Sequence, residues 1–387
     1  MRKIEVGKTI QLITNLGLIA LVSSCGGSSS SGSSQNVVVV ASDRAVSDLA
    51  DDQSGYQIHV LYVVASDGMD RALDTDGTIA LSVESWNAWL STQTGGIDLR
   101  LDTANGALDI TFVRLNRSDA QMNAYGGQLR DQLETELATK GFDVSNKLYL
   151  VYYDGGGAQT PSCGGGAYPP SLPGTVAALY LNGMPSGSAP CSTNPFATAV
   201  DSPGYIEFVG IHEVMHVLGF VPSCSPNETA AGHVLDDNID VMYAGPLAWN
   251  PTVLDVNRDD YYEANAPNCI DFADSAFLSP LPATPQPPPG WPYEMLSTIS
   301  CADEALLQST AGDRTRIQFI NGTDAPVNVY WLDFSGTRQF RRTLGPYEGF
   351  LARTFTTHPW VITDETNQCL GIFMGSANMG RAIARSN

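Results

Sequence analysis

The segment Glu207–Phe220 reads Glu-Phe-Val-Gly-Ile-His-Glu-Val-Met-His-Val-Leu-Gly-Phe, and the interpretation of the whole chain starts from it. Apolar residues cover most of the helix that this segment predicts, so we expect the helix to be buried. His212 and His216 are four residues apart and therefore lie on one face, where two imidazoles can bind one zinc ion. Buried imidazoles need such a compensating partner.

Glu213 directly follows the first of these histidines, beside the position that a catalytic zinc site leaves open. There its carboxylate can take a proton from a water molecule that the metal activates. The chain has five histidines, and three of them fall between residues 212 and 233, so a chance match is a poor explanation. We therefore expect one zinc ion per chain, with Glu213 as general base.

Length and charge limit the remaining possibilities. The chain has 387 residues, which is enough for two domains. Its 41 acidic and 20 basic residues give a formal net charge of −21. Such an acidic chain is a poor partner for nucleic acid, so we expect no nucleic-acid binding.

The N-terminus is typical of an export signal. A basic start precedes Ile10–Val22, which is mostly apolar and too short to span a membrane. The following Ser-Ser-Cys25 resembles a bacterial lipobox, so we expect residues 1–25 to be a lipoprotein signal peptide and Cys25 to be lipidated. Gly26, rather than aspartate, follows the cysteine, which favours the outer membrane or cell surface. Residues 26–55 are expected to be a Gly/Ser-rich and then acidic linker.

Six further cysteines are an even number, which in an exported chain predicts disulfides. The chain has no C-x-x-C pair, so a zinc–thiolate cluster is not expected. Fifteen pairings are possible. The pairs that we expect, from their proximity around the site, are Cys163–Cys191 and Cys224–Cys269, and Cys301–Cys369 is a further candidate across the predicted domain boundary.

Residues 56–310 mix helices and strands without strict alternation, so the predicted fold class is α+β. His59 falls in the first strand and is expected to be structural. The predicted elements are strand 56–64, helix 79–94, strands 99–101 and 108–115, helix 121–140, strand 147–153, a Gly-rich loop at 155–166, strand 177–181 and the histidine helix.

Asp255, Asn257 and Asp259 follow in a D-x-N-x-D spacing that resembles the start of a calcium loop. The glycine and closing glutamate of such a loop are missing, so the calcium hypothesis is weakly supported. Residues 279–292 are Pro-rich and predict a surface loop or spacer.

Residues 311–387 contain short strand-like runs separated by turns, which predict a small all-β sandwich. The expected strands are 316–320, 327–334, 338–344, 349–355, 360–363 and 369–374.

His212-Glu-Val-Met-His216-Val-Leu-Gly219 resembles the metzincin zinc peptidases, whose signature is H-E-x-x-H-x-x-G-x-x-H followed by a methionine turn. Asp240-Val-Met242-Tyr243 looks like that Met-turn. The third histidine departs from the pattern, because Pro222 occupies its position. The resemblance implies a peptidase domain at residues 56–310 with a third ligand from elsewhere.

His233 is our candidate for this third ligand, because it lies between the helix and the predicted Met-turn. Carboxylates are the alternatives. Those nearby are Asp236, Asp237 and Asp240, and a runner-up clan with a distal glutamate would use Glu228 or Glu263.

The C-terminal segment resembles the β-domain of the von Hippel–Lindau family. The matching stretches are Arg316-Ile-Gln-Phe-Ile-Asn321, Val329–Gly336, Thr343-Leu344 and His358–Asp364. The resemblance implies a peptide-binding pocket in which His358 and Trp360 match, whereas Arg341 and Thr354 replace a tyrosine and a serine. The alternative is that His358 and Trp360 simply pack inside the sandwich.

Together these observations predict an exported, lipid-anchored zinc endopeptidase with a C-terminal module that binds peptide or protein. The membrane partner would be reached through the N-terminal lipid. Two alternatives remain open: a surface binding lipoprotein whose protease-like domain is a scaffold, and a zinc hydrolase of a non-peptide substrate.

Overall fold

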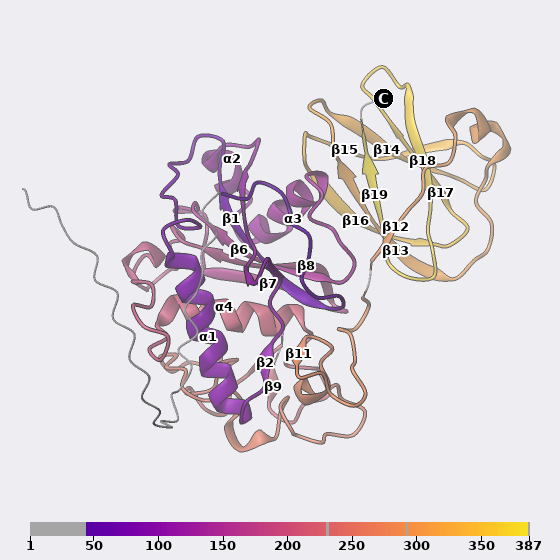
Figure 1. The fold of residues 1–387 in the computed structure, drawn as a ribbon. Helices are drawn as coiled ribbons and strands as arrows, with labels where there is room; N and C mark the ends of the chain where they lie inside the picture. Colours follow the sequence, from indigo (N-terminus) through magenta and orange to yellow (C-terminus); the bar gives the residue numbers. More distant parts are fainter. Residues whose placement is uncertain (1–43, 230–231, 292, 386–387) are drawn as a thin grey trace, which may run out of the picture. The chain divides into compact units, whose positions relative to one another are not determined.

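The computed structural model describes residues 44–229, 232–291 and 293–385 (Figure 1). The predicted signal peptide 1–25, its Cys25 and most of the predicted linker lie outside these residues. None of the helices within the described residues has the length and apolar character that crossing a membrane requires. The described chain mixes helices with several sheets, in keeping with an α+β class.

A five-stranded sheet forms the centre of the N-terminal part, with its strands in the order β5-β1-β6-β8-β7. The first four are parallel to one another, and β7 is antiparallel to β8 at the edge. Their bounds are β1 Gln57–Val64, β5 Ile110–Arg114, β6 Lys147–Tyr153, β7 Gly164–Tyr168 and β8 Leu172–Tyr180. The strand predictions at β1, β5, β6 and β8 are confirmed.

The sequence prediction of a loop over 155–166 is wrong at its end, where β7 begins. Glycines have low strand propensity, yet Gly164 pairs with Leu179 and Gly166 pairs with Ala177 of β8. The tertiary packing explains this, because a Cβ on Gly166 would come within 2.8 Å of the His216 Cβ. The absence of side chains here lets the histidine helix lie close against the strand.

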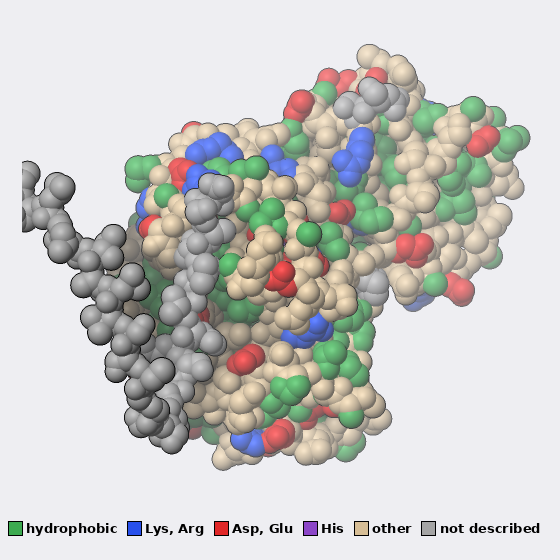
Figure 2. All heavy atoms as spheres, viewed as in Figure 1, with side chains coloured by type: hydrophobic (Ala, Val, Ile, Leu, Met, Phe, Trp, Pro, Cys, Tyr) green, Lys and Arg blue, Asp and Glu red, His purple; other side chains and the backbone are tan. Residues whose placement is uncertain are grey.

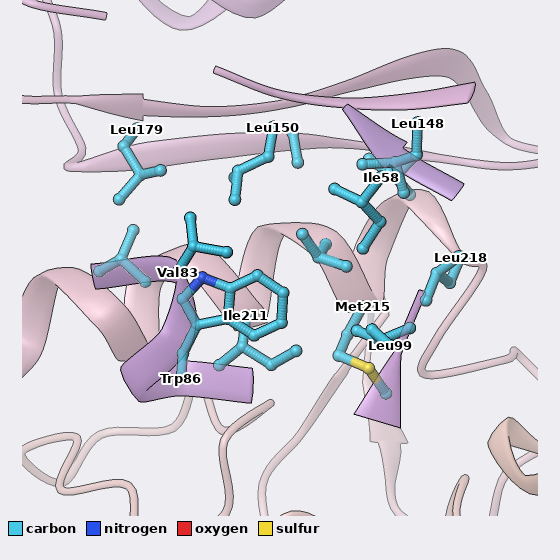
Figure 3. Close-up of a cluster of buried hydrophobic side chains, with 14 of the residues drawn as sticks. Ile58, Val83, Trp86, Leu99, Leu148, Leu150, Leu179, Ile211, Met215 and Leu218 are labelled. Atoms are coloured by element: carbon cyan, nitrogen blue, oxygen red, sulfur yellow. The ribbon is translucent and has the colours of Figure 1, made fainter. Parts of the chain in front are cut away.

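Helices cover both faces of the sheet. Helices α1 (Thr78–Thr94) and α4 (Tyr205–Val217) pack on one face, where Figure 3 shows Val83 and Trp86 opposite Ile211 and the sheet residues Leu150 and Leu179. On the other face, alternate strand residues such as Leu61 and Val63 pack against helix α3 (Leu129–Thr139). Alternate burial on both sides explains why these strands read as continuous apolar runs.

The predicted helix 121–140 is not continuous. It divides into α2 (Asp119–Asn123), a 3₁₀ turn at Gly126–Gln128 and α3. Gly126 has a φ of +54°, which an α-helix cannot contain. Ser118 caps α2 by accepting the backbone N–H of Gln121, so the first helix also starts earlier than expected.

The predicted linker 26–55 extends too far, because its acidic end packs on the sheet. Arg44 forms ion pairs with Asp70 and Asp74. Lys147 of β6 binds Asp48 and Asp51 at 2.7 Å each. Two of the carboxylates that made this stretch look like a solvated linker therefore pair with the buried Lys147.

Loops and short elements connect the larger helices and strands of the N-terminal part. Cys163–Cys191 and Cys224–Cys269 are disulfide-bonded as predicted. The short elements are β2 Asp98–Leu99, β3 Thr103–Ala104, β4 Ala107–Leu108, η2 Cys191–Thr193, β9 Glu228–Thr229, β10 His233–Val234, η3 Val256–Arg258, η4 Phe272–Asp274 and β11 Leu278–Ser279.

The C-terminal module, residues 294–385, contains two four-stranded sheets, β12-β19-β13-β16 and β15-β14-β17-β18. Residues from both sheets share one hydrophobic cluster that includes Phe319, Val329 and Trp360. Its elements are β12 Glu294–Met295, η5 Cys301–Leu306, β13 Arg314–Asn321, β14 Val327–Leu332, β15 Arg338–Leu344, β16 Gly349–Phe355, β17 Pro359–Thr363, β18 Cys369–Met374 and β19 Gly380–Ala384.

The predicted boundary at residue 311 is too late. β12 pairs with β19, so residues 294–295 already belong to a sheet of the module. The disulfide Cys301–Cys369 is present as predicted and ties the preceding turn to β18. The six strand predictions are confirmed, whereas β12 and β19 were missed because two residues and a Gly-Arg-Ala run give little strand signal.

A buried ion pair joins the module to the rest of the chain. Arg381 of β19 contacts Glu134 of α3 at 2.6 Å, and both side chains are fully buried. Arg381 also donates to Gln318, and Thr135 donates to the backbone oxygen of Tyr347. The face shown in Figure 2 carries dispersed acidic and basic side chains.

Candidate metal centre

Helix α4 is fixed in place at its N-terminus by a buried carboxylate. Glu207 accepts the backbone N–H of Gly204 at 2.9 Å, which satisfies one of the free donors at a helix start. The same side chain accepts Ser82 Oγ of α1 at 2.7 Å and the backbone N–H of Ala197. These contacts set the position of the helix that carries His212, Glu213 and His216.

Three histidines converge on one point. The Nε2 atom of His216 lies 3.1 Å from Nε2 of His212 and 3.1 Å from Nε2 of His233. Within the described part of the chain, these three form one of the groups whose ligand atoms could hold a metal ion. Three nitrogens bound tetrahedrally to zinc at 2.0–2.1 Å would be about 3.3 Å apart, so the spacing fits.

Backbone carbonyls orient two of these rings. His212 Nδ1 donates to the Val241 oxygen at 2.7 Å, and His216 Nδ1 donates to the Phe220 oxygen at 3.2 Å. A proton on Nδ1 leaves the lone pair on Nε2, the atom that faces the other rings. Burial and the neighbouring histidines lower the pKa of both, that of His212 to about 3, which keeps the imidazoles neutral.

The segment predicted to be a Met-turn lies against His212. Asp240 accepts the backbone N–H of Met242 at 2.7 Å, which closes the turn, and Met242 is fully buried. Val241 supplies the carbonyl that binds His212. The turn therefore acts on the site through its backbone.

His233 reaches the site from the β9–β10 hairpin. The neighbouring Val234 donates its N–H to the Met242 oxygen at 3.0 Å, and Val221 donates to the Gly232 oxygen. Both bonds attach the hairpin to segments that contact the other two histidines. The convergence agrees with the proposed ligand set, and zinc binding itself stays a prediction.

The structure uses the alternative carboxylates elsewhere. Asp240 accepts hydrogen bonds from Met242, Val256 and Tyr261. Asp236 clusters with Asp259 and Asp260, apart from the three histidines. Glu263 forms an ion pair with Arg258. Glu228 accepts a long hydrogen bond from the backbone N–H of Gly232. Asp237 accepts a hydrogen bond from the backbone N–H of Ile239. None of these groups, within the described residues, belongs to the histidine cluster.

Glu213 is buried between α4 and the edge strand β7. A Cβ on Gly164 would lie 2.6 Å from Glu213 Oε1, so only glycine leaves this approach open. Burial raises the pKa of Glu213 to about 8, although the Gly166 N–H and Arg130 act in the opposite direction. A bound cation beside the carboxylate would favour its ionised form.

Sequence reasoning missed several parts of this site. Trp249 packs edge-on against His212 with ring centroids 5.6 Å apart, and Tyr168 packs against His216 at 6.0 Å. Tyr168 also donates to the Val221 oxygen at 2.6 Å. The run Gly164-Gly-Gly166-Ala-Tyr168 was the available signal, because glycine inside a strand often marks a close approach.

The calcium hypothesis rests on residues that the structure separates. Asp255 Oδ2 accepts the backbone N–H groups of Asp260, Tyr261 and Tyr262, and so holds its own loop. Asn257 is exposed with a φ of +67°. Asp259 lies near Asp236 and Asp260 instead, so calcium stays an untested prediction.

The predicted peptide pocket of the C-terminal module is divided between two environments. Trp360 is buried in the module core and donates to Thr354 Oγ1 at 2.9 Å. Arg341 lies over the Trp331 ring, and His358 packs among Trp331, Phe334 and Phe355. Because Trp360 is buried, the packing interpretation is favoured at this position, and the peptide-binding pocket stays a prediction.

Comparison with known proteins gives little further information. No family profile and no curated protein matches the chain. Crystal structures of wild-type OgpA from Akkermansia muciniphila, and of catalytically inactive OgpA with an O-glycopeptide (glycodrosocin) substrate, match with TM-scores of 0.28 and 0.29. Each is 12% identical and covers 87% of this chain and 96% of that one. Likeness at this level shows neither a shared fold nor a shared function.

Proposed function

We propose that this chain is a zinc-dependent endopeptidase, with His212, His216 and His233 as the zinc ligands. The observation that carries the proposal is the convergence of three Nε2 atoms next to a buried glutamate. Backbone carbonyls orient the imidazoles of His212 and His216 with Nε2 towards the common point, and such a cluster suits a divalent cation.

Zinc bound there would supply a Lewis acid and lower the pKa of a water molecule to about 7. The chain's own part is the proton transfer. The carboxylate of Glu213 would accept a proton from the attacking water and then donate it to the amine that leaves. The close packing of Gly164 and Gly166 restricts the carboxylate to this position.

The free edge of β7 supports a peptide as the substrate. β7 pairs with β8 on one side only and passes beside Glu213 and His216. An extended peptide can add to such an edge through backbone hydrogen bonds. A small non-peptide substrate would not use this edge, which favours the endopeptidase over the alternatives.

Metal analysis and proteolysis test the proposal together. The purified protein should contain about one zinc per chain and cleave casein, and a chelator should abolish the cleavage. His233→Ala should lose zinc and activity, whereas His358→Ala, a matched control in the C-terminal module, should keep both. Full zinc retention in His233→Ala would remove His233 from the ligand set. A zinc-loaded protein that cleaves no peptide would instead support a scaffold or a non-peptide hydrolase.

We also propose that the enzyme is exported and anchored through lipid on Cys25. Lipoprotein processing adds more than one acyl chain, and two acyl signals anchor a protein stably. The support is the sequence alone, since Cys25 lies outside the described residues. Its bacterial cell-surface or outer-membrane location follows from the same lipobox reading.

A further inference from the structure

A basic pocket lies where the edge strand β7 ends. It has a volume of about 670 Å³, and its walls include Pro169 and Pro170, which follow β7, and Arg314, Arg316 and Arg353 of the C-terminal module. Arg316 donates to the Pro170 oxygen at 3.0 Å, which holds one wall against the other. The volume is within the range of pockets that bind small ligands or peptide side chains.

The three arginines of the pocket lie close together on one sheet. Arg316 lies directly opposite Arg353 in the antiparallel pair β13–β16, and like charges at such positions are destabilising. Arg314 is two residues from Arg316 and therefore on the same face of the sheet. Along the described ranges, none of the three forms an ion pair, and no carboxylate lines the pocket.

A cluster of three arginines without ion-pair partners among the described residues is unusual in a chain as acidic as this one. The chain carries 41 acidic residues, and other arginines such as Arg117 and Arg338 pair with glutamates. Arg314 and Arg353 are exposed, so an incoming anion can reach them. Arginine binds carboxylates in a planar, bidentate way that gives specificity as well as attraction.

The path of β7 connects this pocket to the metal centre. Gly166 packs against Glu213 and His216, and Pro170 lies four residues further along the chain. β7 ends at Tyr168, two residues beyond Gly166, and the chain turns at Pro169 and Pro170. At about 3.3 Å per residue, a peptide on the strand edge would therefore reach the pocket wall within roughly four residues.

We propose that the arginine pocket binds the carboxylates of an acidic segment of the peptide substrate, about four residues from the scissile bond. This inference rests on the proposed function. Arg314, Arg316 and Arg353 would select substrates that carry Glu or Asp on one side of the cleaved bond. They act on binding and take no part in the chemical step.

Paired peptides test the selectivity. A peptide cleaved from casein would be resynthesised with Glu or Gln four residues from the bond, first on one side and then on the other. In the double variant Arg314→Gln/Arg353→Gln, kcat/KM for the Glu peptide should fall about five- to thirty-fold, mainly through KM, with the Gln peptide unchanged. The matched control, Arg342→Gln/Arg385→Gln, removes the same charge at exposed positions outside the pocket lining and should not discriminate. Equal losses for Glu and Gln peptides, or equal losses in the control, would overturn the proposal.

A binding measurement separates this proposal from the proposed function. Fluorescein-labelled hexaglutamate should bind the intact protein with Glu213→Gln, by anisotropy, and binding should weaken when Arg314→Gln/Arg353→Gln is added. If the wild-type protein cleaves no peptide but this difference persists, the peptidase proposal fails and the acidic-ligand pocket stands. If hexaglutamate binds equally with and without the pocket arginines, the pocket proposal fails. The melting temperature should not fall in the arginine variant, because a like-charge pair is removed.

Discussion

Within the described residues, two clusters contain histidine and could hold a metal by geometry alone. One consists of His212, His216 and His233, and the other of His59 with Asp48, Asp102 and Asp109. In the second cluster, His59 Nδ1 lies 2.6 Å from Asp102 and Nε2 lies 3.0 Å from Thr111. Lys147 contributes its ammonium group to Asp48 and Asp102 at 2.7 Å each.

The difference lies in where the positive charge comes from. Around His59 the chain provides its own cation, so the carboxylates are compensated by Lys147 and both ring nitrogens are engaged. Around His216, the Nε2 atoms of His212 and His233 each lie 3.1 Å from its own Nε2, and burial lowers the pKa of His212 and His216. Geometric proximity of ligand-type side chains therefore does not identify a metal site until the existing partners of each atom are known.

The largest effect should come from Glu213→Gln. The variant keeps the side-chain volume and removes the proton acceptor, so kcat for peptide cleavage should fall about 10²–10⁴-fold. Zinc content should stay near one per chain, because Glu213 is not among the three histidines. Metal analysis and cleavage rates on the same preparation check both. Wild-type cleavage by this variant would refute the assigned role of Glu213.

An intermediate effect is expected at Asp102, and it concerns stability. Breaking a buried, hydrogen-bonded ion pair leaves Lys147 and His59 incompletely compensated, so Asp102→Asn should lower the free energy of unfolding by about 3 kcal/mol. Zinc content and the activity of the folded fraction should be unchanged. Denaturant unfolding measures the loss, and loss of zinc from the folded variant would show that the two clusters are not separate.

The same residue predicts a pH dependence. Burial raises the pKa of Asp102, but hydrogen bonds from His59 and Lys147 outweigh this and leave the pKa below its ordinary value. A carboxyl with a depressed folded pKa stabilises the fold above its unfolded pKa, about 3.9, and loses this contribution as pH falls through the folded value. Zinc-free wild type should therefore lose more stability below about pH 4 than zinc-free Asp102→Asn.

The contrast also explains how far the sequence could be read. The four-residue spacing of His212 and His216 is enough to predict that both lie on one face of a helix. The apolar runs of strands β1 and β6 are equally local sequence patterns. The His59 cluster depends on Asp102 and Lys147, which are 43 and 88 positions away, and no local pattern connects them. Strand β7 was missed for a similar reason. Its glycines are explained only by the close packing of α4, which leaves no room for a Cβ atom at Gly164 or Gly166.

The smallest effect on stability is expected at the predicted calcium loop. Its acidic group, Asp236, Asp259 and Asp260, can be compared with the two histidine clusters in the same way. Asp260 accepts the Asn227 backbone N–H at 2.8 Å and its side-chain amide at 3.2 Å, so part of this group is compensated by the chain. Asp255 is engaged by three backbone N–H groups, which leaves little reason for calcium to use the D-x-N-x-D spacing.

Adding calcium to zinc-loaded protein should therefore leave the melting temperature unchanged. Asp259→Asn should change the free energy of unfolding by less than about 0.5 kcal/mol, because the half-buried side chain keeps its volume and accepts only a long hydrogen bond from Asn227. Asp255→Ala is the matched comparison and should cost about 1–3 kcal/mol, because buried donors lose their acceptor. A calcium-dependent rise in melting temperature that disappears in Asp259→Asn would show that this acidic group binds a cation from outside the chain, as we propose for the three histidines.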